Sequence, residues 1–523
     1  MVRNIADLLR INAHYYPNKR AVVDSEKEFT WREVHERSNR LANALIGLGC
    51  KKGDRVAILA YNSSEYVEII FACAKAGLIF VPINFRLAPQ EIEYILSDST
   101  PTTLLFGKDF SDIASSLRPS SPLNYLCVGG DLTWAKEYES LITSNSSQEQ
   151  PEELVSEDDP AEIFYTSGTT GLAKGVIHTH QARLRGALMC VLDGELSYDD
   201  VYLVNVPALC HVAGWVWTLA NAYVGASIVI SKLRGFDPEG ILKTIQDYSI
   251  TNLQMVPVTI MELIEFPRIR EYDFSSLRMI FYATAPMPAG PLREALSIFG
   301  NIFMQPYGLT ETGPNVTCLR KKEHNISNLS NEEAEKRLKS CGRPCYGILV
   351  KLVDEEGQEV PPHTVGEIIV KSNDIMEGYW NNEEETQKVM KDGWIYTGDL
   401  ATYDEDYFIY LVDRKKDMII SGGLNIYPAE VERVIYEHPM VSQCAVIGVP
   451  DDRWGEAVKA FVIVGKGKHV SEDEIIQFCR KSLASYKKPK SVEFVEELPR
   501  NPQGKILKRV LREKYWAHRE RKI

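Results

Sequence analysis

The sequence lacks the features that mark several large classes of protein. Its 10 cysteines are scattered from Cys50 to Cys479, and no two are separated by only two residues, which argues against a zinc ribbon or a dense disulfide framework. Basic residues number 59 against 72 acidic ones, a formal net charge of -13. No nucleic-acid partner is expected, because such binding depends on neutralising phosphates.

The chain is also poor in long apolar runs. Charged Asp7 and Arg10 interrupt the first residues, so we expect no secretory signal and a cytoplasmic location. The stretch from Val212 to Ile230 carries no charge and approaches the roughly 20 apolar residues of a membrane span. We predict instead a buried helix, a turn at Gly225 and a strand from Ala226 to Ile230, and therefore no transmembrane span.

Positive charge is concentrated in one place, after Lys505. The main interpretation is a solvated helix face, and the weaker alternative is attraction of an anionic cofactor. The basic residues of this stretch are Lys508, Arg509, Arg512, Lys514, Arg519, Arg521 and Lys522.

At 523 residues the chain exceeds a single hydrophobic core of roughly 250 to 300 residues. Short β-branched runs such as 55–59 alternate with helical patterns such as 64–76, which predicts an α/β fold with parallel sheets covered by helices. The two halves of this region are expected to form two layers. From 347 to 371 the pattern indicates antiparallel strands of a small barrel-like sheet, and after residue 413 a compact α+β piece.

The most informative run extends from Ala161 to Val176 and reads AEIFYTSGTTGLAKGV. An apolar strand leads into a loop with three glycines, four hydroxyl side chains and Lys174. Glycines let backbone N–H groups approach phosphate oxygens, hydroxyls add donors and the lysine adds charge. The run predicts a polyphosphate-binding loop. It is not a Walker A sequence, and an ordinary surface turn is the alternative.

Further motifs follow in a fixed order: YGLTET at 307–312, YTGD at 396–399, DRKKD at 413–417, SGGLNIYPAEVE at 421–432 and PRNPQGK at 499–505. Together with the loop at 166–175, these motifs are distributed across nearly the whole chain. In these motifs the chain resembles the adenylate-forming superfamily, which includes acyl-CoA synthetases, firefly luciferases and peptide-synthetase adenylation domains.

The resemblance implies a large N-terminal domain, 1–412, of two helix-covered sheets plus a small β-barrel-like subdomain. A mobile α+β C-terminal domain, 413–523, would carry the catalytic lysine. It implies an AMP-forming acid–CoA ligase that uses ATP, Mg²⁺ and coenzyme A: the acid and ATP give an acyl-adenylate and pyrophosphate, and CoA then displaces AMP. Free CoA is favoured because no carrier sequence follows Ile523. Homodimerisation is left open.

The resemblance also implies the roles of individual residues. Lys505 would neutralise the reacting phosphorus, Glu311 would bind Mg²⁺, and Asp413 would be the hinge. Catalysis would further involve Thr310 and His211. Nucleotide and CoA binding would fall to Thr166, Ser167, Gly168, Thr169, Thr170, Lys174, Ala285, Tyr307, Gly308, Thr310, Asp399, Arg414, Gly422, Gly423 and Lys505. The acid pocket would include His211, Trp215, Ala283 and Thr284, with Trp217 as a further candidate wall.

Two positions depart from the family pattern. Ala173 stands where a proline is usual, which should only loosen the loop. Ala283 stands where a glycine is usual, and its methyl group would narrow the pocket or shift the backbone. No Lys or Arg occurs between Gly186 and Ser231. We therefore expect an apolar monocarboxylic acid, either a medium-chain fatty acid or an aromatic one.

Other functions compete with this interpretation. A P-loop NTPase or kinase lacks its signature here, and Lys505, Glu311 and Asp399 together speak against a regulatory protein that has lost catalysis. A luciferase-like oxygenase and a ligase acting on a separate carrier protein share the adenylation step, and both remain open.

Overall fold

The computed structural model describes residues 2–24, 27–117, 124–151, 154–166, 173–205, 208–231, 235–285, 287–422, 424–465, 467–501 and 505–517. By compactness the chain divides into two units. Unit 1 comprises Met1–Val350 and Val370–Ile395, and unit 2 comprises Lys351–Ile369 and Tyr396–Ile523. The predicted boundary at residue 413, with a mobile part behind it, stays a prediction.

Unit 1 contains an eight-stranded sheet among the described residues, and most of its neighbouring strands are parallel. Helices that connect its strands include α3 (Ser64–Ala76), α4 (Pro89–Ser99), α5 (Ser111–Leu117) and α6 (Tyr138–Ser144). Parallel strands need such helical crossovers between them, and the predicted alternation of strands and helices is therefore present. The strand order is β19 (Gly378–Tyr379), β9 (Lys174–Thr179), β8 (Pro160–Thr166), β4 (Ile79–Pro82), β3 (Arg55–Leu59), β5 (Thr103–Gly107), β6 (Asn124–Val128) and β7 (Lys136–Glu137).

A second sheet of unit 1 has nine strands in the described part of the chain. Their order is β16 (Arg343–Pro344), β15 (Gly313–Leu319), β14 (Phe303–Leu309), β13 (Met279–Tyr282), β12 (Asn252–Met255), β10 (Val201–Val204), β11 (Ser227–Ile230), β1 (Arg20–Asp24) and β2 (Lys27–Thr30). Thus β1 and β2 come from the N-terminal end of the chain, so the two layers do not follow the two halves cleanly. Buried Val22 and Val23 pair with Ile228 and Val229 of β11, and this contact between distant segments draws the strand into the second sheet.

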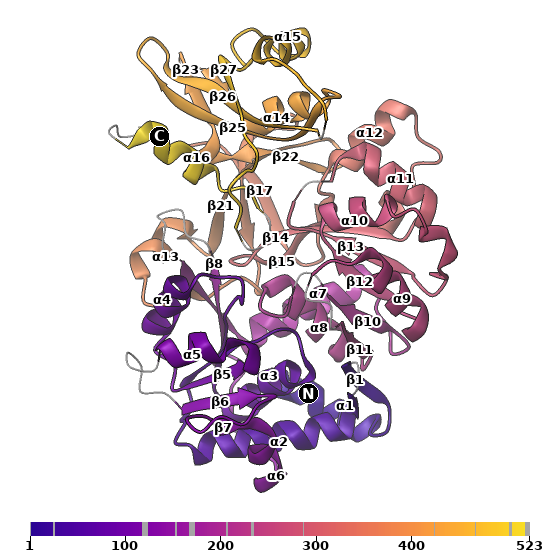
Figure 1. Cartoon of the computed structure of the whole chain (residues 1–523), viewed down its shortest axis with the longest axis vertical. Coiled ribbons are helices and arrows are strands. Elements are labelled where there is room, and N and C mark those ends of the chain that lie inside the picture. Colours follow the sequence, from indigo (N-terminus) through magenta and orange to yellow (C-terminus); the bar gives the residue numbers. More distant parts are fainter. Residues whose placement is uncertain are drawn as a thin grey trace. The chain divides into compact units, whose positions relative to one another are not determined.

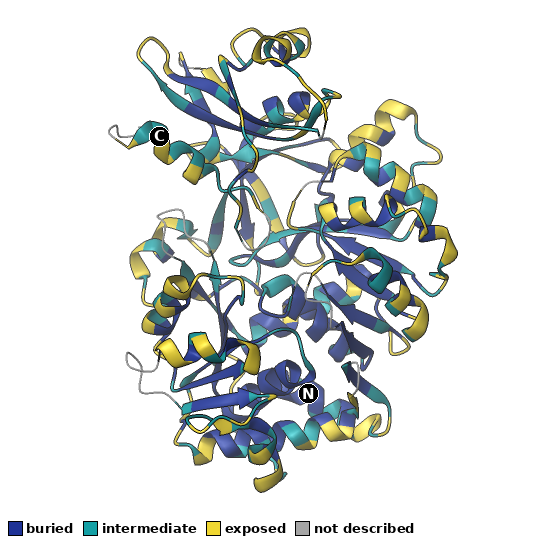
Figure 2. Cartoon of the chain, viewed as in Figure 1, coloured by how far each residue is buried: buried dark blue, intermediate teal, exposed yellow. Residues whose placement is uncertain are grey.

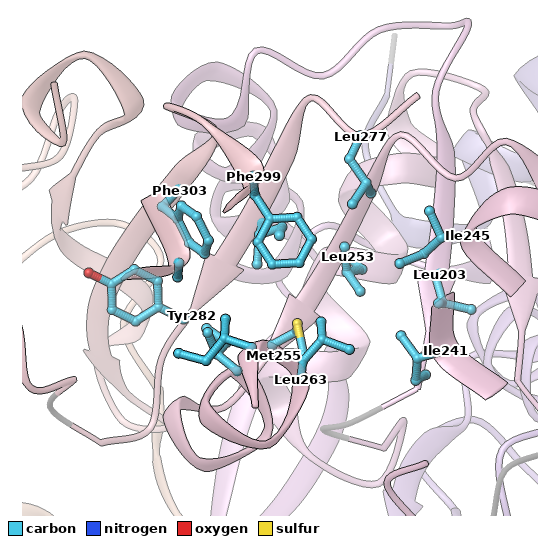
Figure 3. Close-up of a cluster of buried hydrophobic side chains, with 14 of the residues drawn as sticks. Leu203, Ile241, Ile245, Leu253, Met255, Leu263, Leu277, Tyr282, Phe299 and Phe303 are labelled. Atoms are coloured by element: carbon cyan, nitrogen blue, oxygen red, sulfur yellow. The ribbon is translucent and has the colours of Figure 1, made fainter. Parts of the chain in front are cut away.

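The core of the second sheet is built by apolar side chains of its strands and of the helices packed on it. The helices of this region are α7 (His180–Gly194), α8 (Val212–Tyr223), α9 (Pro238–Tyr248), α10 (Pro257–Ile264), α11 (Ala289–Phe299) and α12 (Asn331–Lys339). Leu203, Leu253 and Met255 of the strands meet Ile241 and Leu263 of the helices in one buried cluster (Figure 3). Figure 1 labels α9, α10 and α11 beside β10, β12 and β13.

Helix α8 accounts for the uncharged stretch. It ends at Tyr223, Gly225 follows with a positive φ of 70°, and β11 begins at Ser227. The predicted helix, turn and strand are therefore confirmed. In the part of the chain that the structure describes, no helix has both the length and the apolar character to cross a bilayer. Most of α8 is buried inside unit 1 (Figure 2).

Two long helices, α1 (Ile5–Tyr15) and α2 (Trp31–Gly47), begin unit 1, and α13 (Glu383–Val389) follows near its end. A five-stranded sheet forms where the barrel-like part was predicted. Its order among the described residues is β17 (Leu349–Val353), β18 (Gly366–Lys371), β21 (Trp394–Tyr403) and β20 (Met390–Lys391), with β22 (Ile409–Arg414) also paired to β21.

The end of unit 2 is the predicted α+β piece. Its sheet, within the described residues, has the order β24 (Leu424–Ile426), β23 (Ile419–Ser421), β26 (Gly455–Val464) and β25 (Val441–Asp451), with β27 (Ser491–Phe494) paired to β26. The helices are α14 (Pro428–Tyr436), α15 (Glu472–Ser482) and α16 (Lys508–Trp516). Ser471 caps α15, because its hydroxyl accepts a hydrogen bond from the Glu474 amide.

Candidate active site

Strands β8 and β9 hold the ends of the predicted phosphate loop. Thr166 and Lys174 are paired opposite each other where these strands separate. The loop residues Ser167, Gly168, Thr169 and Thr170 lie outside the described residues. The Lys174 ammonium forms an ion pair with Glu385 and lies 4.9 Å from the centre of the Tyr379 ring.

The YGLTET motif forms a tight turn between β14, which contains Tyr307 and Gly308, and β15. The Thr312 hydroxyl lies inside this turn and accepts a hydrogen bond of 2.9 Å from the Leu309 amide. A Cβ atom on Gly308 would lie 2.4 Å from the Gly313 carbonyl oxygen. Glycine is therefore required at 308 because the two strands approach so closely.

Glu311 connects this turn with the phosphate-loop strands. Its Oε1 accepts a hydrogen bond of 3.0 Å from the Tyr379 hydroxyl, and its carbonyl accepts one of 2.9 Å from the Met376 amide. Burial, followed by the Glu311 charge, raises the pKa of Tyr379, so the phenol stays a donor. Lys174, Tyr379 and Glu311 thus form one continuous group of contacts, and Thr310 precedes Glu311 in the same turn.

The segment after β13 has an unusual backbone. Thr284 has a φ of 75°, a conformation that β-branched residues rarely adopt and that costs about 1–3 kcal/mol. Ala283 is half-buried, whereas Thr284 and Ala285 are exposed. Such strain concentrates at functional positions, and these are the positions that the resemblance assigns to the acid and the nucleotide.

The predicted acid wall begins just before α8. His211 is the N-cap residue of that helix, and the preceding Leu209 amide donates a 2.8 Å hydrogen bond to Asn62. Desolvation, with a smaller effect of Arg86, lowers the pKa of His211 to about 4. The imidazole is therefore neutral near pH 7. The charge of Arg86, a residue far away in the sequence, therefore acts electrostatically on His211 of the predicted wall.

The two tryptophans of α8 have different environments. Trp215 is fully buried and its Nε1 donates a 2.6 Å hydrogen bond to Glu162 Oε2 on β8. The Trp217 ring stacks on Phe281 with centroids 3.8 Å apart, which is core packing. Residues two apart on a helix point in different directions, so only Trp215 faces the phosphate-loop strands.

Glu162 is the centre of a buried charged group. Arg183 of α7 forms an ion pair with its Oε1, and His178 Nδ1 lies 4.0 Å from the same oxygen. Burial raises the pKa of Glu162, although Arg183 acts in the opposite direction. Desolvation, followed by Arg183, lowers the pKa of His178, so this ring is neutral.

The YTGD motif of unit 2 lies within strand β21, where several hydrogen bonds fix its conformation. Gly398, with a φ of 70°, donates a 3.0 Å hydrogen bond from its amide to Glu367 Oε1. The Asp399 amide donates to the Thr397 hydroxyl at 3.1 Å. The largely buried Asp399 carboxylate forms an ion pair of 2.9 Å with Arg414. Asp399 and Arg414, which the resemblance assigns to the same nucleotide, are therefore neighbours.

Asp413 accepts hydrogen bonds of 2.7 Å each from the Arg414 and Ala429 amides, so it fixes the first turn of α14. Gly422 has a φ of 60°, and a Cβ atom there would lie 2.7 Å from the Trp454 ring. Gly423 lies outside the described residues. A glycine is needed at 422 both for its conformation and for this contact.

Lys505 belongs to a charged cluster of unit 2. Desolvation, with a further contribution from Arg414, lowers the pKa of Lys505 to about 8, while Asp399 acts in the opposite direction. The structure thus brings Lys505 close to Asp399 and Arg414, although more than ninety residues separate it from either.

Comparison with known proteins decides the family. The model for "AMP-binding enzyme" matches residues 9–380, and the model for the C-terminal domain of AMP-binding enzymes matches residues 430–505. This chain belongs to the AMP-binding enzyme family. The resemblance to adenylate-forming enzymes and the α/β fold are confirmed, and the protein is an ATP-binding, AMP-forming ligase of the acyl-CoA synthetase type.

Individual members of the family are similar over their full lengths. The chain is 37% identical to a feruloyl-CoA synthase from Amycolatopsis sp. over 96% of this chain and 97% of that protein. It is 34% identical to a fatty acid–[acyl-carrier-protein] ligase from Streptomyces coeruleorubidus over 100% of this chain and 98% of that one. The crystal structure of ATP-bound MatB from Rhodopseudomonas palustris superposes with a TM-score of 0.87 at 30% identity, covering 98% and 99% of the two chains.

No sequence pattern singled out several charged residues that lie at the candidate site of this AMP-binding enzyme. Arg86, Glu162 and Arg183 act on the predicted acid wall, and Glu367 accepts a hydrogen bond from Gly398 of the YTGD motif. Arg86 lies 125 residues before His211, and no local pattern connects the two. The only available signal was chemical: Glu162 interrupts an otherwise apolar strand, and a buried carboxylate requires a partner.

Proposed function

We propose that this protein is an acid–CoA ligase acting on an apolar monocarboxylic acid, either a medium-chain fatty acid or an aromatic acid. The observation that carries the proposal is the pair of charged groups at the family motifs: Lys174 and Glu311 around Tyr379 in unit 1, and Lys505 with Arg414 and Asp399 in unit 2. Each supplies what adenylation requires, namely cations for phosphates and carboxylates for ribose hydroxyls or a metal.

In the first half-reaction a carboxylate oxygen of the acid attacks the α-phosphorus of ATP, and the bond to pyrophosphate breaks. Negative charge grows on the phosphorus oxygens and on the leaving group, so fixed cations lower the barrier. Lys505 neutralises this charge, while Lys174 and the hydroxyls of the neighbouring loop bind the outgoing phosphates. Thr310 hydrogen-bonds a phosphate oxygen, and Tyr307 offers its ring face to adenine.

Asp399 accepts hydrogen bonds from the ribose hydroxyls, because an ionised carboxylate has acceptor oxygens only. Arg414 holds that carboxylate in place and is itself available to a phosphate or the ribose. Ala285 lies beside the strained Thr284, where exposed backbone groups are available to the adenine.

Mg²⁺ fits the residues at the turn. This ion prefers one or two carboxylates together with substrate phosphates, and Glu311 presents a carboxylate positioned through Oε1 by Tyr379. The metal would neutralise phosphate charge when bound. Glu311 would hold it, and Tyr379 would fix the orientation of Glu311.

In the second half-reaction the CoA thiol forms a bond to the acyl carbon and AMP leaves. Gly422 and Gly423 would face the pantetheine arm, and Gly422 brings no side chain to this place beside Trp454. Asp413 would be the residue about which the C-terminal part turns between the two half-reactions. One active site would thereby serve both steps and exclude water from the labile acyl-adenylate anhydride.

The acid itself would contact His211, Trp215, Ala283 and Thr284. A neutral His211 and a fully buried Trp215 favour an apolar body over a second charge. Arg86 acts on His211, so dicarboxylates belong in the test as the contrary class.

The test is ATP–pyrophosphate exchange with a panel of acids, followed by release of AMP with and without CoA. Medium-chain and aromatic monocarboxylates should support exchange, and AMP release should require CoA and consume no oxygen. Exchange with dicarboxylates alone would refute the acid class. Oxygen uptake coupled to AMP release would instead identify an oxygenase.

A second candidate acceptor is the thiol of a separate acyl carrier protein. The full-length similarity to a fatty acid–[acyl-carrier-protein] ligase favours it. Acyl transfer to a purified phosphopantetheinylated carrier protein, with none to free CoA, would support this acceptor over CoA.

A further inference from the structure

The basic C-terminal helix α16 is not simply a solvated face. Lys508 Nζ lies 2.8 Å from Glu432 Oε1, and Arg512 Nη2 lies 2.7 Å from Asp417 Oδ1. All four side chains are at most 18% exposed. By contrast, Arg509 and Glu513 form a 3.0 Å pair on the same helix with 47% and 63% of their side chains exposed. The helix therefore has one inward-facing and one solvated set of charges.

Arg512 connects α16 to the 3₁₀ turn Lys415–Asp417. Besides its pair with Asp417, its Nη1 donates a 3.5 Å hydrogen bond to the Lys416 carbonyl oxygen. This turn directly follows Arg414, which forms the ion pair with Asp399. Arg512 thus anchors the peptide that carries one of the predicted nucleotide-binding residues.

Lys508 adds a second attachment, to helix α14. Its partner Glu432 also accepts a 2.7 Å hydrogen bond from the Val446 amide, so this carboxylate is fixed from two sides. Desolvation alone would lower the pKa of Lys508, but Glu432, Asp413 and Asp417 together raise it. Lys508 is therefore a permanent cation among three carboxylates, one of which belongs to the predicted hinge residue.

Lys505 lies in the short connection that leads into α16. The Leu507 amide donates to the Pro499 carbonyl at 2.8 Å, and the Lys505 amide donates to Asn501 Oδ1 at 2.8 Å. These two hydrogen bonds tie Lys505 and Leu507, just before α16, to Asn501 and Pro499. The charged groups that act on the Lys505 ammonium are Arg414, Asp399, Lys416 and Asp417, which belong to the YTGD motif of β21 and to the peptide anchored by Arg512.

We propose that Arg512 and Lys508 are positioning residues, which hold helix α16 against residues 413–417 so that Lys505 stays beside Arg414 and Asp399 for the adenylation step. This inference rests on the proposed role of Lys505 in adenylation. Lys508 and Arg512 thereby have a function other than solvation or attraction of an anionic cofactor. Their charges are already neutralised by Glu432 and Asp417.

The experiment uses the full-length protein with Arg512→Gln, Arg512→Lys, Asp417→Asn, Lys505→Ala and the matched control Arg509→Gln. ATP–pyrophosphate exchange, with the most active acid of the panel above, reports adenylation. Release of AMP from the synthetic acyl-adenylate of that acid, with CoA, reports the second half-reaction. Arg512→Gln should lower kcat of exchange about 10- to 100-fold, because small misplacements of a catalytic group have effects of this size.

The second half-reaction should change less than about threefold in Arg512→Gln, and Arg509→Gln should stay within about twofold of the parent in both assays, as expected for an exposed pair. Arg512→Lys, which keeps the charge, should recover part of the exchange rate. Asp417→Asn should match Arg512→Gln, and combining the two should add little, because they remove the same contact.

Equal rates in Arg512→Gln and Arg509→Gln would overturn the inference. A parallel loss of both half-reactions, with a lower melting temperature, would also overturn it by indicating a purely structural pair. If Lys505→Ala keeps normal exchange, the proposed function of Lys505 fails and the inference fails with it. If Lys505→Ala loses exchange while Arg512→Gln does not, only the inference fails.

Discussion

The buried group around Glu162 gives a sharp prediction for the stability of unit 1. Glu162 accepts a 2.6 Å hydrogen bond from Trp215 and forms an ion pair with Arg183, and all three side chains are almost completely buried. Arg183→Met removes the cation but keeps an apolar side chain of similar length. Glu162 then keeps its bond to Trp215 and the neutral His178 ring, whose Nδ1 lies 4.0 Å from Oε1, and breaking a buried pair in this way costs about 3–5 kcal/mol.

The pH dependence of this loss follows from the remaining carboxylate. Without Arg183 the folded-state pKa of Glu162 rises further, so the folded protein holds a proton that the unfolded chain has lost. Stability therefore falls as pH rises above the unfolded value of about 4.3. Protonating the carboxylate costs about 1.4 kcal/mol per pH unit, which limits the loss to about 5 kcal/mol near pH 8 and about 1 kcal/mol near pH 5.

The assay is equilibrium urea unfolding followed by circular dichroism across this pH range. The double variant Glu162→Gln/Arg183→Met leaves neither charge of this pair and should recover most of the lost stability. Arg268→Met is the control, because Arg268 and Glu239 form an ion pair that is about half exposed, and it should change stability by less than about 1 kcal/mol. A loss in Arg183→Met that is small near pH 8, or that does not shrink on acidification, would refute the reasoning.

Three further predictions concern the proposed chemistry. Lys505→Ala should lower pyrophosphate exchange by about 100-fold or more. In the parent protein, kcat/KM for ATP should decline above about pH 8, because the pKa of Lys505 is about 8 and the cation is lost above it. A flat pH profile would contradict this. Glu311→Gln should raise the Mg²⁺ concentration for half-maximal exchange by about tenfold, with an unchanged melting temperature, and an unchanged Mg²⁺ titration would argue against a metal ligand at this position. Gly422→Ala places a methyl group 2.7 Å from the Trp454 ring at a φ of 60°, so thioester formation should fall more than exchange, as measured by CoA-dependent AMP release; equal effects on both assays would count against a CoA path there.

Much of the fold could be predicted because its signals are local. The strand 55–59 and the helix 64–76 have the predicted bounds, since period and end signals lie within each segment. Strands β1 and β2 were not predicted, because four or five residues give too little pattern. Their place in the sheet depends on β11, which lies about two hundred residues further along the chain.

The same distinction between local patterns and distant contacts applies to the candidate site. Glycine-rich and hydroxyl-rich runs indicated the predicted phosphate loop and the YGLTET and YTGD motifs, because phosphate and ribose binding need particular residues in consecutive positions. By itself the sequence therefore determined the family and the fold class, and it predicts which motifs carry the chemistry. Only the tertiary structure decided which charges neighbour one another: Arg183 against Glu162, Arg86 near His211, and Arg512 against Asp417. The physical reason is that an ion pair is fixed by distance in space, and the 21 to 125 residues between these partners leave no periodic trace along the chain.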